Sequence, residues 1–366
     1  MKILFVGDYS NFHATLARAL RRMGHDTTVI SSGSRCMDTS RDIDLQRATG
    51  KWGAVKYLYK IYRLLPRLSG YDVVQLINPN FFELKPDKIR WLFDRLRRQN
   101  RYVSLSLTGN DPFYVQACCE GRDFRYTEYR IGDERAPFAI QNPRNEIDWT
   151  TDAMLHHCRY VYDHIDGAVS CLYEYHRVGE RFLGDKLRYI GIPIDVDAIE
   201  YTPLIVADKV NIFVGVKSEM MTFKGTDRLL AAARRVEADY PHLCRVLLVE
   251  DKPYNEYMRL LKSAHIVLDQ LYSYTPATNA LGAMAMGKVV VSGAEPEYYD
   301  FIGERELRPI VNVLPDDEDI YNRLVSLVTS PQLLARLSAS GRELVVKHNA
   351  ASLVAERYLS HLPFNH

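Results

Sequence analysis

The chain has 366 residues, which is too long for one compact hydrophobic core and predicts about two domains. Its 47% hydrophobic and 25% charged residues are typical of soluble globular protein. No apolar stretch approaches the roughly 20 residues of a membrane-spanning helix, and Met1 leads into an apolar strand rather than a signal peptide, so we expect a cytoplasmic protein. The net charge of +1 is unevenly spread: residues 1–110 hold 19 basic and 9 acidic residues, against 28 and 37 in the remainder. This asymmetry points to an anionic partner for the N-terminal part.

The first elements predict a parallel, doubly wound α/β sheet. Residues 2–7 form a short apolar strand, residues 12–23 a helix with its apolar side inward, and residues 27–31 a second strand. Such a unit binds its ligands at the carboxyl ends of the strands. The first turn lacks the GxGxxG pattern of a dinucleotide site, which disfavours an oxidoreductase. His13 follows this turn, where it could orient a bound substrate, the acceptor of a transferred group, or simply cap or pack the helix.

A basic helix rich in aromatic residues is predicted over residues 51–67. Its cations share one face at helical spacing: Lys56, Lys60, Arg63 and Arg67. Such a helix can lie on an anionic membrane surface, or it can be a solvated helix that packs its apolar side on the sheet, and the sequence leaves both open. A second basic helix over residues 86–101 favours the membrane somewhat. Because no recognition motif accompanies the charge, nucleic acid is not an expected partner.

Polar residues follow the later strands of this first series. Residues 72–77 and 102–107 continue the sheet, and Asp111 comes just after them, where it could assist proton removal from an acceptor. Residues 112–152 are predicted to be loops and short helices, whose arginines could meet an anionic acceptor or be solvated surface; these are Arg122, Arg125, Arg130 and Arg135. Four histidines between residues 156 and 176 and six scattered cysteines lack the spacing of metal ligands, so no metal site is expected.

A second strand–helix series begins at Val210, after a domain boundary near residues 201–208. Lys217 and Lys224 follow its first strand and precede a helix over residues 226–238. Strands over residues 245–251 and 265–271 come next, and the latter delivers Tyr274 to the carboxyl edge of the sheet. This edge is again where a ligand is expected.

The stretch TPATNALGAMAMGKVVVSGAEPE, residues 275–297, predicts a helix, a buried strand and a loop that ends at Glu297. Thr275 can cap the helix, with Pro276 in its first turn. The backbone N–H groups left free would be those of Ala277, Thr278 and Asn279. Such groups, with the positive end of the helix dipole, can bind a diphosphate. For the helix alone, simple packing against a parallel strand is the better explanation, but for the whole 23-residue run it is not.

The run LGAMAMGKVVVSGAEPE resembles the signature lEAMAxGxPVVxxxxGGxPE of retaining GT-B glycosyltransferases of family 4. The opening GDYSNFHATLARALRRMGHDTTVIS and the passage IGIPIDVDAI are similar to two further stretches of that family. The resemblance implies a GT-B fold, in which two Rossmann-like domains face a cleft. The first would span residues 1–203 with a crossing helix at about 347–366, and the donor domain residues 204–346. The family's Glu-x7-Glu pair falls on Tyr274 and Gly282, so both carboxylates are missing.

The resemblance also implies the activity: transfer of a sugar from a nucleoside-diphosphate sugar to a glycan or lipid-linked acceptor, in cell-surface polysaccharide synthesis and without a metal or cofactor. Lys224 and, with a less well matched spacing, Lys217 would bind the donor diphosphate, and Tyr274 and Glu297 would also contact the donor. Two alternatives stay open. One is a nucleotide-sugar epimerase or phosphorylase on the same fold, and the other is a degenerate, non-catalytic sugar-nucleotide-binding protein.

Gly282 stands where relatives place the Glu that holds the donor ribose. We expect that Gly282→Glu does not tighten donor binding, because the small residues around Gly282 suggest close packing, and because Tyr274 and Asn279 can supply hydrogen bonds instead.

Overall fold

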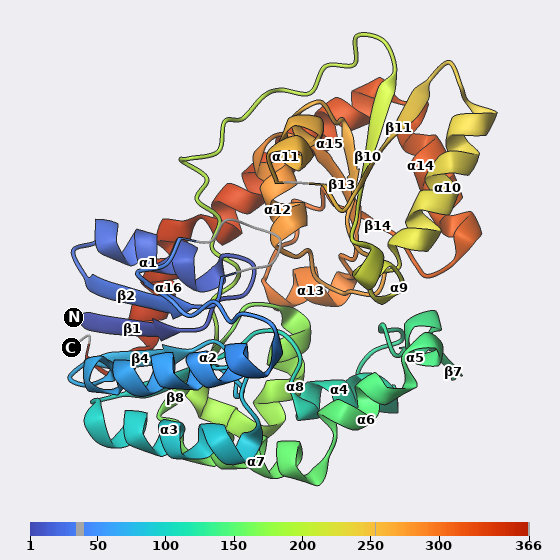
Figure 1. The fold of residues 1–366 in the computed structure, drawn as a ribbon. Helices are drawn as coiled ribbons and strands as arrows, with labels where there is room; N and C mark the ends of the chain where they lie inside the picture. The colour runs from blue at the N-terminus through green and yellow to red at the C-terminus, as the bar shows by residue number, and fades with distance from the viewer. Residues whose placement is uncertain (34–39, 253, 365–366) are drawn as a thin grey trace. The chain divides into compact units, whose positions relative to one another are not determined.

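The computed structural model describes residues 1–33, 40–252 and 254–364 (Figure 1). The chain divides into two compact units. The first consists of Met1–Gln116, Ile147–Pro193 and Ala351–His366, and the second of Ala117–Glu146 and Ile194–Ala350. Cys36 lies outside the described residues, and the other five cysteines are free thiols.

The first unit is built on a parallel sheet of seven strands in the order β3-β2-β1-β4-β5-β8-β9. The strands are β1 (Lys2–Val6), β2 (Asp26–Ser31), β3 (Ile43–Asp44), β4 (Val73–Leu76), β5 (Val103–Leu107), β8 (Gly167–Ser170) and β9 (Leu187–Tyr189). Ile3–Val6 in the central strand are fully buried. This burial explains the continuous apolar run at the start of the chain, because a parallel strand is covered on both faces.

Helices connect and cover these strands: α1 (Phe12–Arg22), α2 (Gly50–Leu64), η1 (Leu65–Leu68), α3 (Pro86–Gln99), α7 (Asp152–His164), α8 (Tyr173–Leu183) and α16 (Ala351–His361). The basic helix predicted over residues 51–67 is therefore an α-helix followed by a 3₁₀ turn. Pro66 explains the change, because it has no N–H to continue the helical hydrogen bonds. The last helix, α16, packs against α1, and its Tyr358 is fully buried beside Phe5.

The second unit contains a parallel sheet in the order β11-β10-β12-β13-β14. Its strands are β10 (Val210–Val216), β11 (Cys244–Glu250), β12 (Ile266–Leu268), β13 (Val289–Ser292) and β14 (Val311–Asn312). The helices are α9 (Met221–Lys224), α10 (Thr226–Asp239), α11 (Tyr254–Lys262), α12 (Thr278–Ala285), α13 (Pro296–Phe301), α14 (Asp317–Val328) and α15 (Pro331–Asn349). The predicted fold class, two doubly wound units with parallel sheets, is confirmed.

The two units differ from the expected domains in their borders. Residues 117–146 group with the second unit, although their place in the sequence suggested the first. This segment carries the hairpin of β6 (Arg130–Ile131) and β7 (Glu134–Arg135) and the short helix α5 (Pro137–Gln141). Phe138 of α5 packs edge-on against Phe223 of α9, with ring centroids 5.0 Å apart. Apolar contacts of this kind, between residues far apart in the chain, assign the segment to the second unit.

Within the described ranges, no helix combines the length and the apolar character needed to cross a bilayer.

Candidate donor site in the second unit

The carboxyl edge of the second sheet gathers the polar groups expected there. Lys217 directly follows β10 and is exposed, Lys224 ends α9, and Asp269 directly follows β12. Gly225 has a φ of 69°, a left-handed conformation that suits glycine and lets α9 turn directly into α10. The N–H of Leu271 donates to the Lys224 carbonyl at 2.8 Å, which ties this turn to the end of β12.

Lys224 lies beside a buried carboxylate. Its Nζ is 3.5 Å from Oδ1 of Asp269, whose side chain is only 1% exposed. The Asn279 amide donates to the same oxygen at 3.4 Å, whereas Asp269 Oδ2 is buried and has no hydrogen-bond partner among the described residues. A buried carboxylate needs a cation or donors nearby, so Asp269 is a physical reason for Lys224 to stay at this edge.

The predicted cradle helix forms, but it begins later than expected. α12 starts at Thr278, with Ala277 as an extended N-cap residue and no side-chain cap, so Thr275 is not the cap and Pro276 is not in the first turn. The reason is a tight turn in which Ser273 Oγ donates to the Thr275 carbonyl at 2.5 Å. The first backbone N–H groups of α12 still lack intrahelical partners, as at every helix start.

Asn279 is less free than the sequence suggested. Its side-chain oxygen accepts from the Tyr257 hydroxyl at 2.8 Å, and its amide reaches Asp269. The side chain is therefore fixed between α11 and β12. What it offers a ligand at the start of α12 is its backbone N–H.

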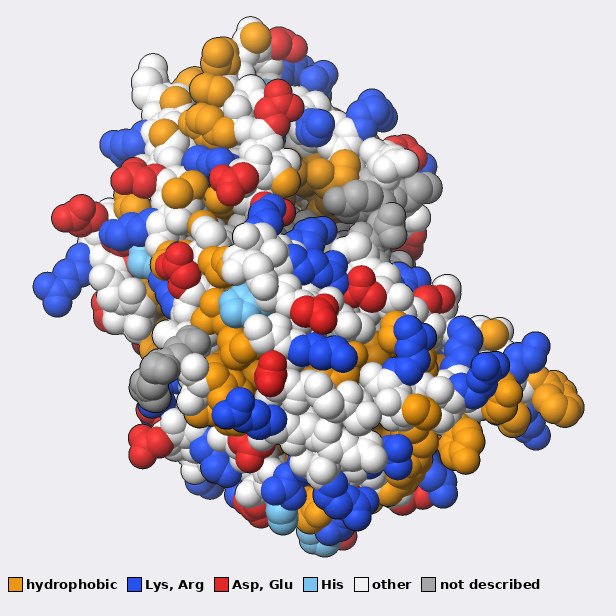
Figure 2. Space-filling view, turned by 90° about the vertical axis from the view of Figure 1, so that its left-hand side faces the viewer, with side chains coloured by type: hydrophobic (Ala, Val, Ile, Leu, Met, Phe, Trp, Pro, Cys, Tyr) orange, Lys and Arg blue, Asp and Glu red, His pale blue; other side chains and the backbone are white. Residues whose placement is uncertain are grey.

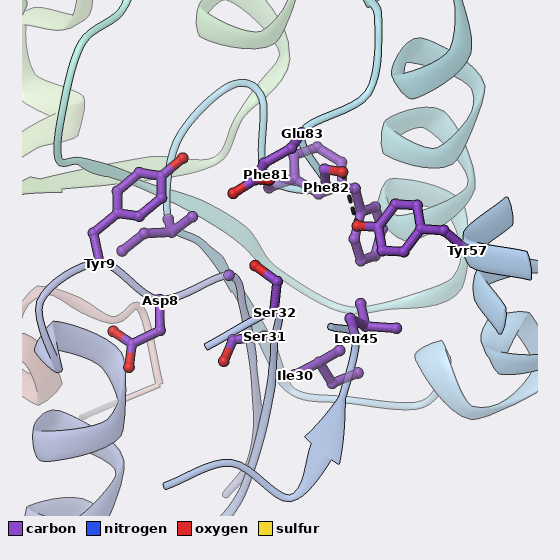
Figure 3. Close-up of a pocket in the computed structure, with 12 residues that line it drawn as sticks. Asp8, Tyr9, Ile30, Ser31, Ser32, Leu45, Tyr57, Phe81, Phe82 and Glu83 are labelled. Carbon is purple, nitrogen blue, oxygen red and sulfur yellow. Dashed lines mark hydrogen bonds between the residues drawn. The ribbon is translucent and has the colours of Figure 1, made fainter. Parts of the chain in front are cut away.

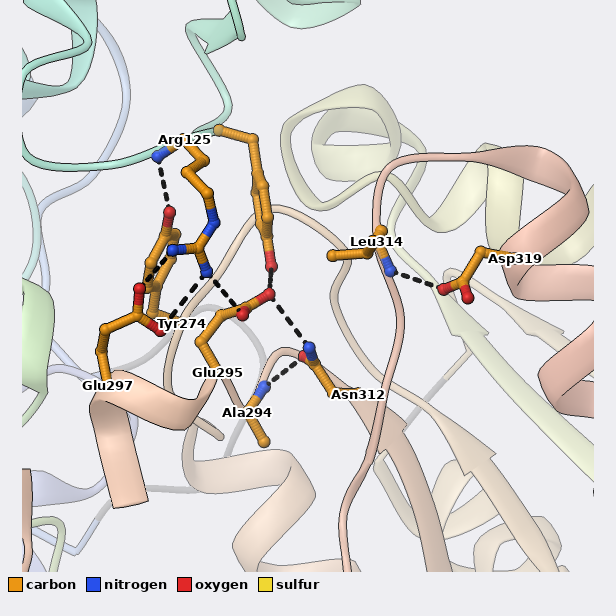
Figure 4. A network of polar contacts seen from close by, with 9 residues as sticks. Arg125, Tyr274, Ala294, Glu295, Glu297, Asn312, Leu314 and Asp319 are labelled. Carbon is orange, nitrogen blue, oxygen red and sulfur yellow. Dashed lines mark hydrogen bonds and ion pairs between the residues drawn. The ribbon is translucent and has the colours of Figure 1, made fainter. Parts of the chain in front are cut away.

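Figure 4 shows a second polar group, centred on Arg125. The guanidinium binds Glu297 and also Glu295, the latter at 2.6 Å. Glu295 is 4% exposed and accepts two more hydrogen bonds, from Tyr126 and, at 3.0 Å, from Asn312. Glu297, the predicted donor ligand, is thus an ion-pair partner, and Arg125 lowers its pKa by a charged hydrogen bond.

Tyr274, in place of the first family Glu, belongs to the same group. Its hydroxyl oxygen accepts the backbone N–H of Arg125 at 2.5 Å, and its ring lies against those of Phe124 and Tyr126. Burial, above all, raises the pKa of Tyr274 to about 12 and that of Tyr126 further. Both phenols therefore stay protonated near neutral pH and are not candidate bases.

Arg125, Tyr126, Glu295 and Asp269 were not predicted as site residues. Arg125 was noted only as one of several arginines in an irregular segment, and nothing local pairs it with residues about 170 positions further along the chain. Asp269 could have been predicted from the sequence, because it directly follows a predicted strand at the ligand-binding edge.

Gly282 has open space around it. A Cβ built on this residue meets no other group within 4 Å, and its backbone is ordinary helix, so the expected crowding is absent. The packing argument against Gly282→Glu is wrong for this reason. The expectation for donor binding itself stays a prediction.

We predict that Gly282→Ala raises the free energy of unfolding by about 0.5–1 kcal/mol, because alanine is the better helix former and meets no obstacle. Urea unfolding of the two proteins measures this. Gly341→Ala is a matched control, since its added Cβ would lie 3.3 Å from Met284 and has to displace it. A loss of stability in Gly282→Ala would contradict the open space.

In the first unit, His13 is enclosed. It is 0% exposed, Nδ1 lies 2.7 Å from the Gly7 carbonyl, and Nε2 lies 3.0 Å from Ser106 Oγ. Burial lowers its pKa to about 3, so the ring is neutral. The ring is thus packed in the structure, and the acceptor role of His13 stays a prediction.

Asp111 is also occupied. Its carboxylate accepts from the Tyr162 hydroxyl at 2.6 Å and from the Tyr114 N–H at 2.9 Å, and it lies at the start of α4 (Pro112–Glu120). Burial raises its pKa despite these hydrogen bonds. Asp111 therefore ties α4 and Tyr162 to this strand end, and its role in proton removal stays a prediction.

A small pocket lies at the carboxyl ends of β1, β2 and β4 (Figure 3). Its polar lining includes Tyr9, Ser31, Ser32 and Glu83. The Asp8 carboxylate turns toward α1, where it accepts the His13 N–H at 2.9 Å, and burial raises its pKa to about 6. This is the edge at which a doubly wound sheet binds ligands, so the pocket is the candidate ligand site of the first unit.

Comparison of the structure with solved proteins identifies the fold. A sucrose-phosphate synthase from Thermosynechococcus elongatus superposes with a TM-score of 0.63 and 14% identity over 98% of both chains. HepE from Anabaena, solved with UDP and glucose, superposes with a TM-score of 0.62 and 12% identity over 99% of this chain and 100% of that one. The chain has the GT-B fold. A UDP-GlcNAc 2-epimerase from Neisseria meningitidis, solved with UDP-GlcNAc, matches with a TM-score of 0.55 and 12% identity over 100% of both chains.

No family model matches the sequence, and no curated protein matches it. At 9–14% identity the GT-B neighbours establish the fold alone.

Proposed function

We propose that the protein is a glycosyltransferase that moves a sugar from a nucleoside-diphosphate sugar to a glycan or lipid-linked acceptor, in the synthesis of a cell-surface polysaccharide. The observation that carries this is the placement of Lys224 at the carboxyl edge of the second sheet, the edge at which α12 also begins. A cation and free helix N–H groups suit the charge that develops on a leaving diphosphate. The resemblance of residues 281–297 to family 4 supports the same assignment.

In this proposal the chain's own groups stabilise the leaving group. Lys224 and the backbone N–H groups of residues 277–279 bind the diphosphate, with Lys217 as a more distant cation. The resemblance implies a transfer without a metal or other cofactor. Because these groups are positioned before the donor arrives, they stabilise the charge without reorganising during the reaction, and this is the main source of rate enhancement in many enzymes.

The missing Glu-x7-Glu pair leaves the donor sugar with other neighbours. Glu297 and Glu295 supply carboxylates near Tyr274, and Arg125 holds both in place. We infer that Glu297, which is 36% exposed, is the carboxylate available to sugar hydroxyls, and that Glu295 is a structural anchor. Retention of configuration, the family 4 outcome, follows from the resemblance. NMR of the anomeric proton in the first-formed product tests it.

The first experiment is a thermal-shift screen of the whole protein against UDP, GDP, ADP and their sugars, followed by product analysis with the donor that stabilises it. A donor that raises the melting temperature and is consumed only when an acceptor is added supports the transferase. If no nucleotide sugar stabilises the protein, the donor-site assignment fails.

An epimerase is the second candidate, because the fold also matches a UDP-GlcNAc 2-epimerase and the Glu pair is absent. Conversion of a nucleotide sugar to its epimer without any acceptor would establish it. Donor binding without turnover under either condition would instead indicate a degenerate binding protein.

Gly282→Glu distinguishes these possibilities further, since the structure offers room for the new side chain. We predict that donor affinity by isothermal titration does not rise above wild type. The Tyr274 hydroxyl already accepts the Arg125 N–H, and the Asn279 amide already donates to Asp269. The site is therefore held together by hydrogen bonds that need no carboxylate at position 282. Clearly tighter binding in the variant would show that the site is a decayed transferase that lacks only this contact.

A further inference from the structure

The outer face of α2 leaves large aromatic and aliphatic side chains uncovered. Trp52 is 80% exposed, Tyr62 69% and Tyr59 60%. Val55 and Leu58 are exposed beside them. Only Gly53, Tyr57 and Ile61 of this 15-residue helix are buried. Isolated exposed apolar residues are ordinary, but a row of them on one helix is typical of a surface that binds a partner.

The exposed residues are ordered by the helical repeat. Trp52, Val55, Tyr59 and Tyr62 are spaced by three or four residues, so they form one stripe along the helix. Lys56, Lys60 and Arg63 have the same spacing and form a second stripe beside it. Residues 50–68 contain five Lys and Arg and no Asp or Glu. We call the two stripes together the α2 face.

Figure 2 shows hydrophobic and basic side chains gathered side by side at the right-hand edge of the molecule, the edge at which α2 lies in that view. The charge of this face is not neutralised by acids of its own helix. Arg63 instead lies over the Tyr59 ring, at 5.9 Å from its centroid. Lys60 donates to the Gln46 carbonyl at 3.4 Å, and its charge acts on Asp44. Lys56, Lys60 and Arg63 are nevertheless all exposed, so the face presents positive charge to an anionic partner.

From this combination we propose that the α2 face docks on the surface of an anionic lipid bilayer. Tyr and Trp side chains favour the boundary between headgroups and acyl chains, while Lys and Arg attract anionic headgroups. An acidic protein surface would pair with the cations but has no general need for a continuous aromatic stripe. The docking is independent of the donor site, which lies in the other unit. It would bring the transferase to lipid-linked acceptors.

The test uses the full chain and sedimentation with vesicles of phosphatidylcholine containing 30% phosphatidylglycerol, compared with phosphatidylcholine alone. We expect binding to the anionic vesicles only, weakened by high salt. Replacing Lys56, Lys60, Arg63 and Arg67 by Gln should lower the partition coefficient at least about 100-fold, since each cation near such a surface contributes about a factor of 5 to 10. Replacing Trp52, Tyr59 and Tyr62 by Ala should remove the binding that survives high salt.

The matched control replaces four exposed cations of the second unit by Gln: Arg259, Lys262, Arg305 and Arg336. It changes the net charge equally, and we expect it to keep most of the binding. In a Trp91→Phe, Trp149→Phe protein, the emission of Trp52 should shift to the blue when vesicles are added. The proposal is overturned if both quadruple variants lose the same share of vesicle binding. It is also overturned if the protein binds only neutral vesicles, or if it binds polyglutamate but no vesicles.

Discussion

Lys224→Ala is expected to lower kcat/KM for the donor by about 100- to 1000-fold, the loss seen when one preorganised group that stabilises a transition-state charge is removed. The physical reason is the position of Lys224 Nζ at the edge where α12 begins, 3.5 Å from Asp269. Steady-state kinetics with the cognate donor measures it. Lys217→Ala should have a smaller effect, because Lys217 is exposed and has no anchoring carboxylate among its described contacts.

The structure adds a control that the sequence did not suggest. Lys224→Ala also leaves the buried Asp269 without its cation, so part of any loss could come from instability. The double variant Lys224→Ala, Asp269→Asn removes the unpaired charge. We expect it to recover stability in urea without recovering activity. If the double variant regains wild-type kcat/KM, Lys224 does not act on the donor.

The sequence predicted the fold well because hydrophobic patterns and helix ends are local. The strands at residues 2–7 and 289–291 and the helix after residue 11 follow from short apolar runs and their spacing. Both sheets then follow from the rules for parallel strand–helix–strand units.

Predictions from local sequence patterns were wrong where residues far apart in the sequence contact each other. The turn at Ser273–Thr275 that delays the start of α12 to Thr278 is itself held by the loop after β13, where the Glu295 N–H donates to the Tyr274 carbonyl at 3.0 Å. Contacts between residues far apart in the sequence also explain the Arg125 group and the membership of residues 117–146 in the second unit. His13 shows a further limit, because a residue at a ligand-binding edge can point into the core instead.

A buried ion-pair group holds the end of α15. Glu304 is 1% exposed, and its Oε2 is 2.8 Å from Lys347 Nζ and 2.7 Å from His348 Nε2. Its Oε1 accepts the N–H groups of Glu306 and Leu307, both at 3.0 Å. Burial by itself would raise the pKa of Glu304, but these charged and backbone hydrogen bonds lower it well below the ordinary value.

Glu304→Ala is therefore expected to lower the free energy of unfolding by about 1–3 kcal/mol, because it leaves the His348 ring and two partly buried backbone N–H groups without their acceptor. Glu306→Ala, at an exposed position two residues away, should change it by less than about 0.5 kcal/mol. The pH dependence has a definite sign. A carboxylate with a depressed pKa stabilises the fold fully above its unfolded pKa of about 4.3, and this contribution is lost progressively as the pH falls from there toward the lower folded pKa. Urea unfolding between pH 7 and pH 3 should thus show a steeper loss of stability in wild type than in Glu304→Gln. Parallel curves for the two proteins would mean that Glu304 is not ionised and paired in the folded chain.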